Sequence, residues 1–370
     1  MKILLINTAS STIINFRKDL IMHLQNTGYE VVVITMDSVY KEEIEQLNIK
    51  QYIVESSNRS VNVFSNLKYK KEIKKIIEIE KPDIVFSFQA KPNTLGIIAA
   101  RNVKYKFAMV EGRGDVFGIK KPLYAILRLI LTSLYRKSFK KIDKVFFLNN
   151  EDFSYFVDKK IIKGEKGIII KGIGINTNEF NKTPITNFET FIMVSRLLPS
   201  KGVMEYCEAA QIVREKGYNY KFLLVGNEAK ITKKDIQKYI DNGSIEYLGL
   251  RKDVKSLLQS STVFVLPSYY HEGLPISILE AMAIGRPILT TDSIGCKETI
   301  FDEKNGFKIK VKDPHDLADK MITIMKDVDL INKYGDYSRY LTESIFEQSI
   351  INNLVLSEMN KCIDKGKERK

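Results

Sequence analysis

The sequence predicts an α/β protein of two domains, each built on a doubly wound parallel sheet with helices on both faces. The length of 370 residues is long for a single core. Short apolar runs alternate with helical patterns in both halves of the chain. A stretch rich in Asn, Thr and Pro separates the halves. The predicted boundaries are a first domain over 1–176, a linker over 177–189, a second domain over 190–345, and a C-terminal helix over 346–370.

In the first half, buried strands are predicted where β-branched and aromatic residues form short apolar runs. The predicted strands are 3–6, 30–35, 82–87, 106–110, 145–148 and 167–170. The predicted helices are 17–25, 67–79, 94–101 and 122–141. Ligands of parallel sheets bind at the carboxyl ends of the strands, so the loops after these strands hold the candidate residues. No Gly-x-Gly-x-x-Gly follows any strand, which argues against a dinucleotide-dependent oxidoreductase.

A carboxylate follows the predicted strand 106–110 in the sequence Glu111-Gly112-Arg113-Gly114-Asp115. Such a group can orient or deprotonate a substrate hydroxyl. Glu111 is the first candidate for this role and Asp115 the second, while a glycine-supported turn with solvated charges is the alternative without a catalytic role. Gln89 and Lys91 end the preceding strand and are expected to line the same site.

Two further substrate-binding candidates are Asn15, two residues before the predicted helix 17–25, and Arg17, its first residue.

Positive charge is concentrated in the first half of the chain. Residues 1–200 hold 32 Lys and Arg against 20 Asp and Glu, whereas residues 201–370 hold 26 against 25. The stretch 122–141 interleaves leucines and isoleucines with basic residues, a pattern that favours a helix lying on an anionic membrane surface. The alternative is a core helix with a solvated basic end. No nucleic-acid-binding motif is present, so no nucleic-acid partner is expected.

The cysteines and histidines are typical of a cytosolic protein, and no metal or cofactor is expected. Three cysteines lie far apart, and neither they nor the three histidines form a metal-ligand pattern. The first residues enter a strand directly, so no signal peptide is expected, and no apolar run is long enough to span a membrane.

The second half repeats the alternation. The predicted strands are 191–194, 221–226, 263–266 and 287–291, and the predicted helices are 275–284, 314–325 and 330–363. Pro275 suits the first position of its helix and Gly285 the position just after its end. The start of this helix favours an anion. Upstream, Arg196 and Lys201 lie five positions apart in a loop after a strand, which suits a diphosphate.

Two glutamates complete a motif around that helix. The strings Glu272-Gly273-Leu274-Pro275 and Glu280-Ala281-Met282-Ala283-Ile284-Gly285-Arg286-Pro287 closely resemble the donor motif of glycosyltransferase family 4. The resemblance covers nearly the whole chain. It implies the GT-B fold, in which two Rossmann-like domains face each other across a cleft and the last helix crosses back to the first domain. It also implies transfer of a sugar from a UDP-sugar, with retention of anomeric configuration and without a metal.

The resemblance also assigns roles to residues. Glu272 would bind hydroxyls of the donor sugar and Glu280 those of the ribose, while Arg196 and Lys201 would neutralise the leaving diphosphate. The other substrate-binding candidates on the donor side are Ser195, Gly226, Arg251, Gly273, Leu274 and Pro275. The chain departs from the family in two places: the loop 7–12 lacks the glycines often found there, and Glu111 stands where many members have a histidine.

Further strings, including Gly295-Cys296-Lys297-Glu298, resemble a bacterial subgroup that extends sugars linked to undecaprenyl diphosphate. This implies a lipid-linked saccharide acceptor, a donor sugar such as N-acetylgalactosamine, and a peripheral position on the cytoplasmic face of the bacterial inner membrane. Two alternatives stay open. One is a UDP-sugar epimerase of the same fold, and the other is an inactive scaffold of a glycan assembly complex, against which the intact Arg196, Lys201, Glu272 and Glu280 argue.

Overall fold

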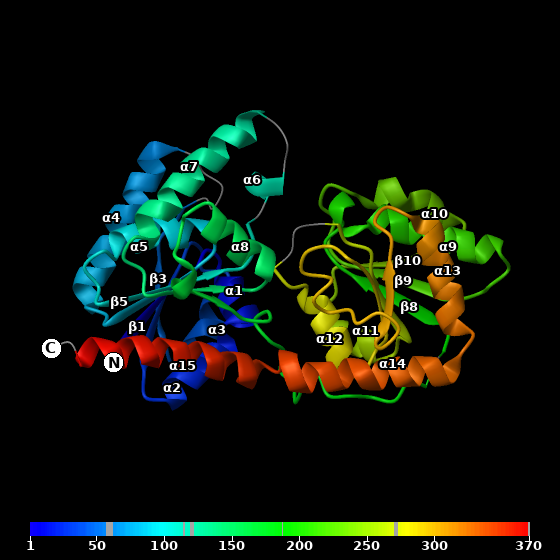
Figure 1. The fold of residues 1–370 in the computed structure, drawn as a ribbon. Helices are drawn as coiled ribbons and strands as arrows, with labels where there is room; N and C mark the ends of the chain where they lie inside the picture. Colours follow the sequence, from blue (N-terminus) through cyan, green and yellow to red (C-terminus); the bar gives the residue numbers. More distant parts are fainter. Residues whose placement is uncertain (57–61, 114, 119–121, 187, 270–272, 369–370) are drawn as a thin grey trace. The chain divides into compact units, whose positions relative to one another are not determined.

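The computed structural model describes the chain except for residues 57–61, 114, 119–121, 187, 270–272 and 369–370. The chain divides into two compact units. Unit 1 comprises Met1–Ile173 with Ile351–Lys370, and unit 2 comprises Gly174–Ile350. Each unit has one sheet of parallel strands with helices on both faces (Figure 1). The predicted fold class, two doubly wound α/β units, is therefore confirmed.

The sheet of unit 1 has the strand order β3-β2-β1-β4-β5-β6-β7. Its strands are β1 (Lys2–Ile6), β2 (Glu30–Thr35), β3 (Lys50–Ile53), β4 (Ile84–Phe88), β5 (Tyr105–Val110), β6 (Lys144–Phe147) and β7 (Gly167–Ile169). The inner strands are apolar on both faces because helices cover both faces. The strand order reverses between β1 and β4, which makes the carboxyl ends of these strands the preferred place for a ligand.

The strands of unit 1 contribute to three core clusters, and alternate residues of β1 supply two of them. Ile3 and Leu5 of β1 pack with α1, α2 and the last helix, whereas Leu4 and Ile6 pack with α4 and α5. The helices are α1 (Ser10–Phe16), α2 (Lys18–Asn26), α3 (Lys41–Glu45), α4 (Val63–Glu80), α5 (Ile97–Ala99), α6 (Asp115–Gly118), α7 (Pro122–Phe139), α8 (Asn150–Asp158) and α15 (Gln348–Lys367), with the short turns η1 (Pro92–Gly96) and η2 (Gly164–Lys166). Val355 and Met359 of α15 are buried in the first of these cores, so the C-terminal helix completes unit 1, as predicted.

Unit 2 has the strand order β10-β9-β8-β11-β12-β13 around a single core. Its strands are β8 (Thr190–Val194), β9 (Lys221–Val225), β10 (Glu246–Gly249), β11 (Val263–Leu266), β12 (Ile288–Thr291) and β13 (Gly306–Ile309). Its helices are α9 (Val203–Glu215), α10 (Gln237–Asp241), α11 (Val254–Gln259), α12 (Ile276–Ile284), α13 (Pro314–Met325) and α14 (Val328–Leu341), with the turns η3 (Pro199–Lys201), η4 (Lys233–Ile236) and η5 (Thr342–Phe346). The order reverses between β8 and β11, so the loops after these two strands are the expected ligand site.

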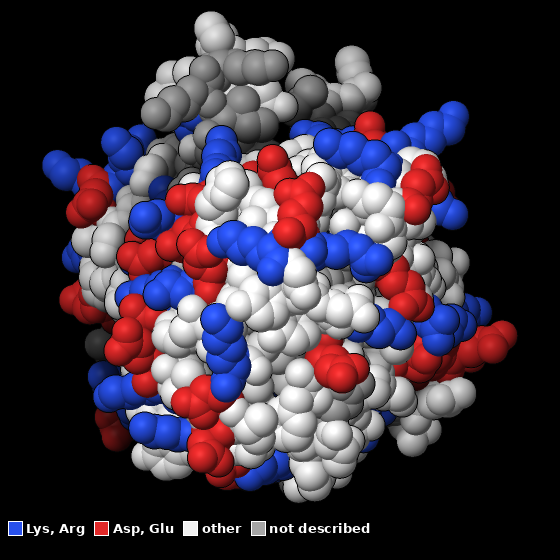
Figure 2. Space-filling model, turned by 90° about the vertical axis from the view of Figure 1, so that its right-hand side faces the viewer, with Lys and Arg blue, Asp and Glu red and all other residues white. Residues whose placement is uncertain are grey.

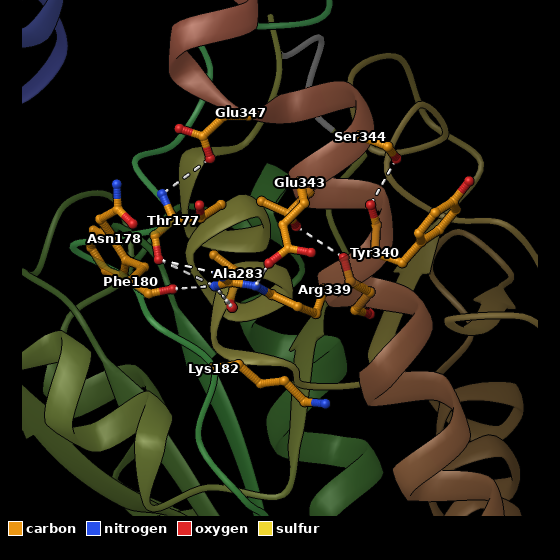
Figure 3. Close-up of polar contacts among 12 residues, drawn as sticks. Thr177, Asn178, Phe180, Lys182, Ala283, Arg339, Tyr340, Glu343, Ser344 and Glu347 are labelled. Carbon is orange, nitrogen blue, oxygen red and sulfur yellow. Dashed lines mark hydrogen bonds and ion pairs between the residues drawn. The ribbon is translucent and has the colours of Figure 1, made fainter.

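Arg339 of α14 forms hydrogen bonds with residues 177–180, at the start of unit 2. The guanidinium donates to the carbonyl oxygens of Phe180 at 2.9 Å and Ala283 at 2.7 Å, and its Nε also bonds Glu343 at 2.6 Å (Figure 3). The backbone N–H of Thr177 donates to the Glu347 carboxylate at 3.3 Å. The first residues of the predicted linker therefore form part of unit 2.

Two predicted elements differ from the structure. Residues 10–16 form α1, although the polar run Ser10-Ser11-Thr12 indicates a loop; Ser10 is buried and its N–H and hydroxyl bond Asp37. The predicted helix 330–363 is broken at Glu347, whose backbone is extended (φ −62°, ψ 130°) between η5 and α15. Both differences come from tertiary hydrogen bonds that sequence periodicity does not report.

Candidate functional site

The carboxyl edge of the unit 1 sheet holds a buried ion pair between Arg17 and Glu111. Arg17 lies between α1 and α2, and Glu111 directly follows β5. The Arg17 guanidinium also lies over the ring of Phe88, at 4.2 Å from its centroid. Gln89, directly after β4, donates to the Glu111 carboxylate at 2.6 Å. Three predicted residues thus converge where β4 and β5 end.

Other predicted residues of unit 1 lie apart from this ion pair. Asn15 is exposed on α1. Lys91 is buried and donates to the hydroxyl of Ser56 at 2.6 Å; burial lowers its pKa. Asp115 begins α6, but its side chain lies outside the described residues.

The loops after β8 and β9 of unit 2 touch at Ser195 and Gly226. Gly226 has a φ of +147°, and a Cβ at this position would lie 1.8 Å from the Ser195 carbonyl oxygen. Arg196 is exposed immediately afterwards, and Lys201 is half-buried at the end of η3. The structure therefore places the two predicted diphosphate-binding cations in one loop at the carboxyl edge of this sheet.

The loop after β11 is hydrogen-bonded to that same loop. The N–H of Tyr269 donates to the Ser200 carbonyl at 2.9 Å, and the Ser268 hydroxyl donates to it at 3.2 Å. The chain thus leaves β11 beside Lys201. Glu272, two residues before Leu274, lies outside the described residues.

The helix after this loop, α12, begins one residue later than predicted. Pro275 is its N-cap with an extended backbone, and the first helical residue is Ile276. Gly273 is half-buried and Leu274 is buried just before it. Gly285 ends the helix with a φ of +88°, the left-handed conformation predicted for it. The predicted arrangement of strand, loop and helix is present.

Glu280 lies on α12 near a second carboxylate. Burial raises the pKa of the Glu280 carboxyl to about 7, and the carboxylate of Glu179 raises it further. A carboxyl group that is half protonated near neutral pH can both donate to and accept from ligand hydroxyls. Arg251, by contrast, is exposed and forms a two-bond ion pair with Asp253, at 2.8 and 2.6 Å.

Comparison with known proteins identifies the family of the chain. The family model described as glycosyl transferases group 1 matches residues 175–340, and the one described as glycosyl transferase 4-like matches residues 2–149. The chain is 33% identical over 351 residues to the N,N'-diacetylbacillosaminyl-diphospho-undecaprenol α-1,3-N-acetylgalactosaminyltransferase of Campylobacter jejuni, covering 88% of this chain and 90% of the relative. The chain belongs to glycosyltransferase family 4. It is a glycosyltransferase of the GT-B fold class.

More distant relatives and solved structures extend the likeness. A UDP-Gal:α-D-GlcNAc-diphosphoundecaprenol α-1,3-galactosyltransferase of Escherichia coli is 25% identical, with 82% of each chain covered. A glycosyltransferase structure from Rickettsia africae superposes with a TM-score of 0.80 at 20% identity, covering 98% of each chain. Anabaena HepE in complex with UDP gives a TM-score of 0.79 at 17% identity, covering 98% of this chain and all of that one. The fold of family 4 therefore extends over both units.

A cavity lined by described residues of unit 2 lies elsewhere in this glycosyltransferase. It measures about 870 Å³ and is lined by Glu303, Lys304, Lys333, Asp336, Tyr337 and Tyr340. Glu303 and Lys304 precede β13, so the cavity lies at the amino edge of the sheet, away from Lys201 and the start of α12. Substrates of α/β sheets bind at the opposite edge.

Sequence reasoning missed Thr8 and Phe88 of the unit 1 site. Thr8 donates from its N–H and its hydroxyl to the Gln89 side-chain oxygen, each at 3.2 Å. Thr8 lies two residues after β1, and Phe88 is the last residue of β4. The strand order reverses between these two strands, and this position is the signal that would have identified both residues.

The described residues contain neither a membrane-spanning helix nor a cluster of metal ligands. In that part of the chain, every helix is too short or too polar to cross a membrane. Across the same residues, no three His, Cys, Asp or Glu side chains gather as metal ligands would.

Proposed function

We propose that this glycosyltransferase transfers an N-acetylhexosamine, such as N-acetylgalactosamine, from its UDP-sugar to a saccharide linked to undecaprenyl diphosphate. The observation that carries the proposal is the 33% identity, over most of both chains, to an enzyme named for that reaction. The galactosyltransferase from Escherichia coli is also named for a diphosphoundecaprenol acceptor. The acceptor class is therefore shared by two relatives that differ in donor sugar.

On the donor side, the proposal assigns the diphosphate to the loops after β8 and β11. Arg196 and Lys201 supply positive charge beside the start of α12, whose free N–H groups favour an anion. As the bond between the anomeric carbon and the diphosphate breaks, negative charge grows on the leaving oxygen, and these groups stabilise it. The proposed transfer is retaining and needs no metal, with Glu272 on the donor sugar and Glu280 on the ribose.

On the acceptor side, Glu111 is the proposed contact to the sugar hydroxyl that attacks the anomeric carbon. The carboxylate stands at the carboxyl edge of the unit 1 sheet, where the strand order favours a ligand. Its side chain is 19% exposed, whereas Arg17 behind it is 1% exposed. A hydroxyl that reaches this edge can therefore bond the carboxylate.

A peripheral position on the cytoplasmic face of a bacterial inner membrane is the third part of the proposal. The first half of α7 exposes Leu123, Ile126, Leu129 and Ile130, and buried residues appear only from Thr132 onward among the described side chains of this helix. The exposed basic residues Lys137, Lys140 and Lys141 follow at its other end. An apolar helix face with nearby cations suits an anionic lipid surface.

The start of α4 adds to this surface, since Val63, Phe64 and Leu67 are also exposed. Both α4 and α7 pack on η1. The excess of positive charge lies in residues 1–200. On the face drawn in Figure 2, by contrast, basic and acidic side chains are interspersed.

The test is incubation of the purified protein with a panel of UDP-sugars, with and without an undecaprenyl-diphosphate-linked saccharide. The proposal predicts release of UDP and a lipid-linked product one sugar longer, only when the acceptor is present. Conversion of one UDP-sugar into another without acceptor would identify an epimerase instead. Absence of any reaction across the panel would favour an inactive scaffold.

A further inference from the structure

Arg17 is a cation enclosed in the interior of unit 1. Its side chain is 1% exposed, its Nη1 donates to the Phe16 carbonyl at 3.0 Å, and its plane lies over Phe88. Burial lowers the pKa of the guanidinium to about 9, which still leaves it charged at neutral pH. A buried charge is strongly unfavourable unless a counter-charge faces it. Glu111 supplies that counter-charge.

The other oxygen of the Glu111 carboxylate is held by Gln89. The Gln89 Nε2 donates to Oε2 of Glu111 at 2.6 Å. The Gln89 side-chain oxygen cannot take this place, because it accepts two bonds from Thr8. The backbone of Gln89 has a φ of +64°, and its carbonyl oxygen accepts the N–H of Asn93 at 2.9 Å. The Gln89 amide is therefore fixed from both its side chain and its backbone.

The Glu111 carboxylate is more exposed to solvent than the Arg17 guanidinium that pairs with it. Of the pair, Glu111 is the member that solvent reaches, at 19% against 1% for Arg17. Each carboxylate oxygen can accept more than one hydrogen bond, so Glu111 has capacity left for a ligand hydroxyl. A ligand at this edge meets the carboxylate and not the guanidinium.

We infer that Arg17 and Gln89 are positioning residues, which hold Glu111 aimed at the attacking hydroxyl of the acceptor sugar without themselves touching that sugar. The inference rests on the proposed function. In the transfer step, the hydroxyl oxygen bonds the anomeric carbon while the bond from that carbon to UDP breaks. The electron pair leaves with UDP, which takes up the hydroxyl proton, and Glu111 keeps the hydroxyl oriented throughout.

The test is a double-mutant cycle with Arg17→Met, Glu111→Gln and the double variant, measured as kcat and KM for both substrates. If Arg17 acts only through Glu111, the single variants each lose on the order of 10²-fold in kcat, and the double variant is no slower than Glu111→Gln alone. The KM for the UDP-sugar stays within about 3-fold throughout. Arg17→Lys, which keeps the charge, recovers part of the rate lost in Arg17→Met.

Independent, multiplicative losses in the double variant would overturn the inference, since Arg17 would then contribute outside Glu111. Lys18→Met, which removes an exposed cation from the adjacent position, is the matched control and should leave kcat unchanged. If wild-type protein transfers no sugar to the lipid-linked acceptor, the proposed function fails, and the inference fails with it.

A second variant covers the case in which Arg17→Met does not fold. In Gln89→Asn, the new asparagine tolerates the positive φ of this position. Its side chain is one methylene shorter than that of glutamine, so its amide no longer reaches Glu111. The inference predicts a lower kcat with an unchanged melting temperature, and no further loss when Glu111→Gln is added. A full rate in Gln89→Asn, or losses that multiply, would contradict a positioning role for Gln89.

Discussion

Gly226 lies against the carbonyl oxygen of Ser195 so closely that a Cβ at residue 226 would come within 1.8 Å of it. The contact joins the loops that follow β8 and β9, and the N–H of Gly226 also bonds the Gly249 carbonyl at 2.8 Å. These loops carry the predicted diphosphate-binding residues. Any side chain at residue 226 must therefore move the backbone that presents Arg196.

We predict that Gly226→Ala lowers the affinity for UDP by at least about tenfold and destabilises the protein by about 1–3 kcal/mol. Calorimetric titration with UDP and thermal unfolding measure the two effects. Gly249→Ala is the matched control: its φ is also positive, at +66°, but a Cβ there would meet no atom within 4 Å. Equal losses in the two variants would show that backbone strain, not contact with Ser195, decides the effect.

Removal of the cations beside α12 should slow transfer more than it alters folding. Lys201→Ala and Arg196→Ala remove charge that stabilises the leaving diphosphate, so we expect losses of about 10²–10³ in kcat with small changes in melting temperature. Lys216→Ala, which removes a distant exposed cation paired with Asp319, is the control and should keep full activity. Near-normal turnover of Lys201→Ala would remove this residue from the reaction.

The raised pKa of Glu280 predicts that stability falls as pH rises. The pKa of Glu280 is about 7 in the folded protein, whereas an unperturbed glutamate in the unfolded chain has a pKa of 4.5. Folding therefore takes up a proton between these values, and stability declines across that window. Glu280→Gln should remove this decline, so the variant gains melting temperature over the wild type at pH 8 but not at pH 4.

Glu179→Gln provides the comparison, because it removes the like charge that contributes to the rise. We expect it to shift the decline of wild-type stability to lower pH without abolishing it. Identical pH profiles for wild type and Glu280→Gln would show that another group titrates in this range.

Vesicle binding should depend on the exposed apolar face of α7. Replacement of Leu123, Ile126 and Leu129 by serine should weaken co-sedimentation with anionic vesicles, while UDP binding persists. Replacement of Lys137, Lys140 and Lys141 by glutamate should do the same and remove the salt sensitivity, since each cation contributes about 1 kcal/mol near the surface. Arg136 is left intact because it donates to the Lys159 carbonyl.

Leu250→Ser is the control for the apolar set, since Leu250 is the most exposed large apolar residue of unit 2 at 76%. It should leave sedimentation unchanged. Wild-type protein that ignores anionic vesicles at low salt would contradict the membrane part of the proposal.

Local patterns predicted the sheets well. The strands β1, β5, β8 and β11 consist mostly of buried apolar residues, and Gly285 ends α12 in the conformation that glycine favours. The strand–helix alternation then determined the fold class. By contrast, the break at Glu347 follows from its hydrogen bond to Thr177, 170 residues away, and periodicity carries no such information.

The sequence predicted individual residues of the unit 1 site but not the contacts between them. Arg17 and Glu111 were separate candidates, because nothing local indicates that a residue between two helices pairs with one beyond β5. Thr8 entered no motif, and its bonds to Gln89 depend on β1 and β4 being neighbours. Strand order, which the sequence leaves open, brings these residues together.

Transfer of a sugar onto a lipid-linked saccharide is the reaction proposed for this protein. The most direct measurement follows radiolabel from UDP-N-acetylgalactosamine into the organic phase, with undecaprenyl-diphosphate-linked N,N'-diacetylbacillosamine as the acceptor. We predict that label enters the lipid with wild-type protein in the presence of chelator, and that Lys201→Ala reduces the rate at least about 10²-fold. Label that stays in water-soluble compounds for the wild type, across the panel of UDP-sugars and acceptors, would contradict the account.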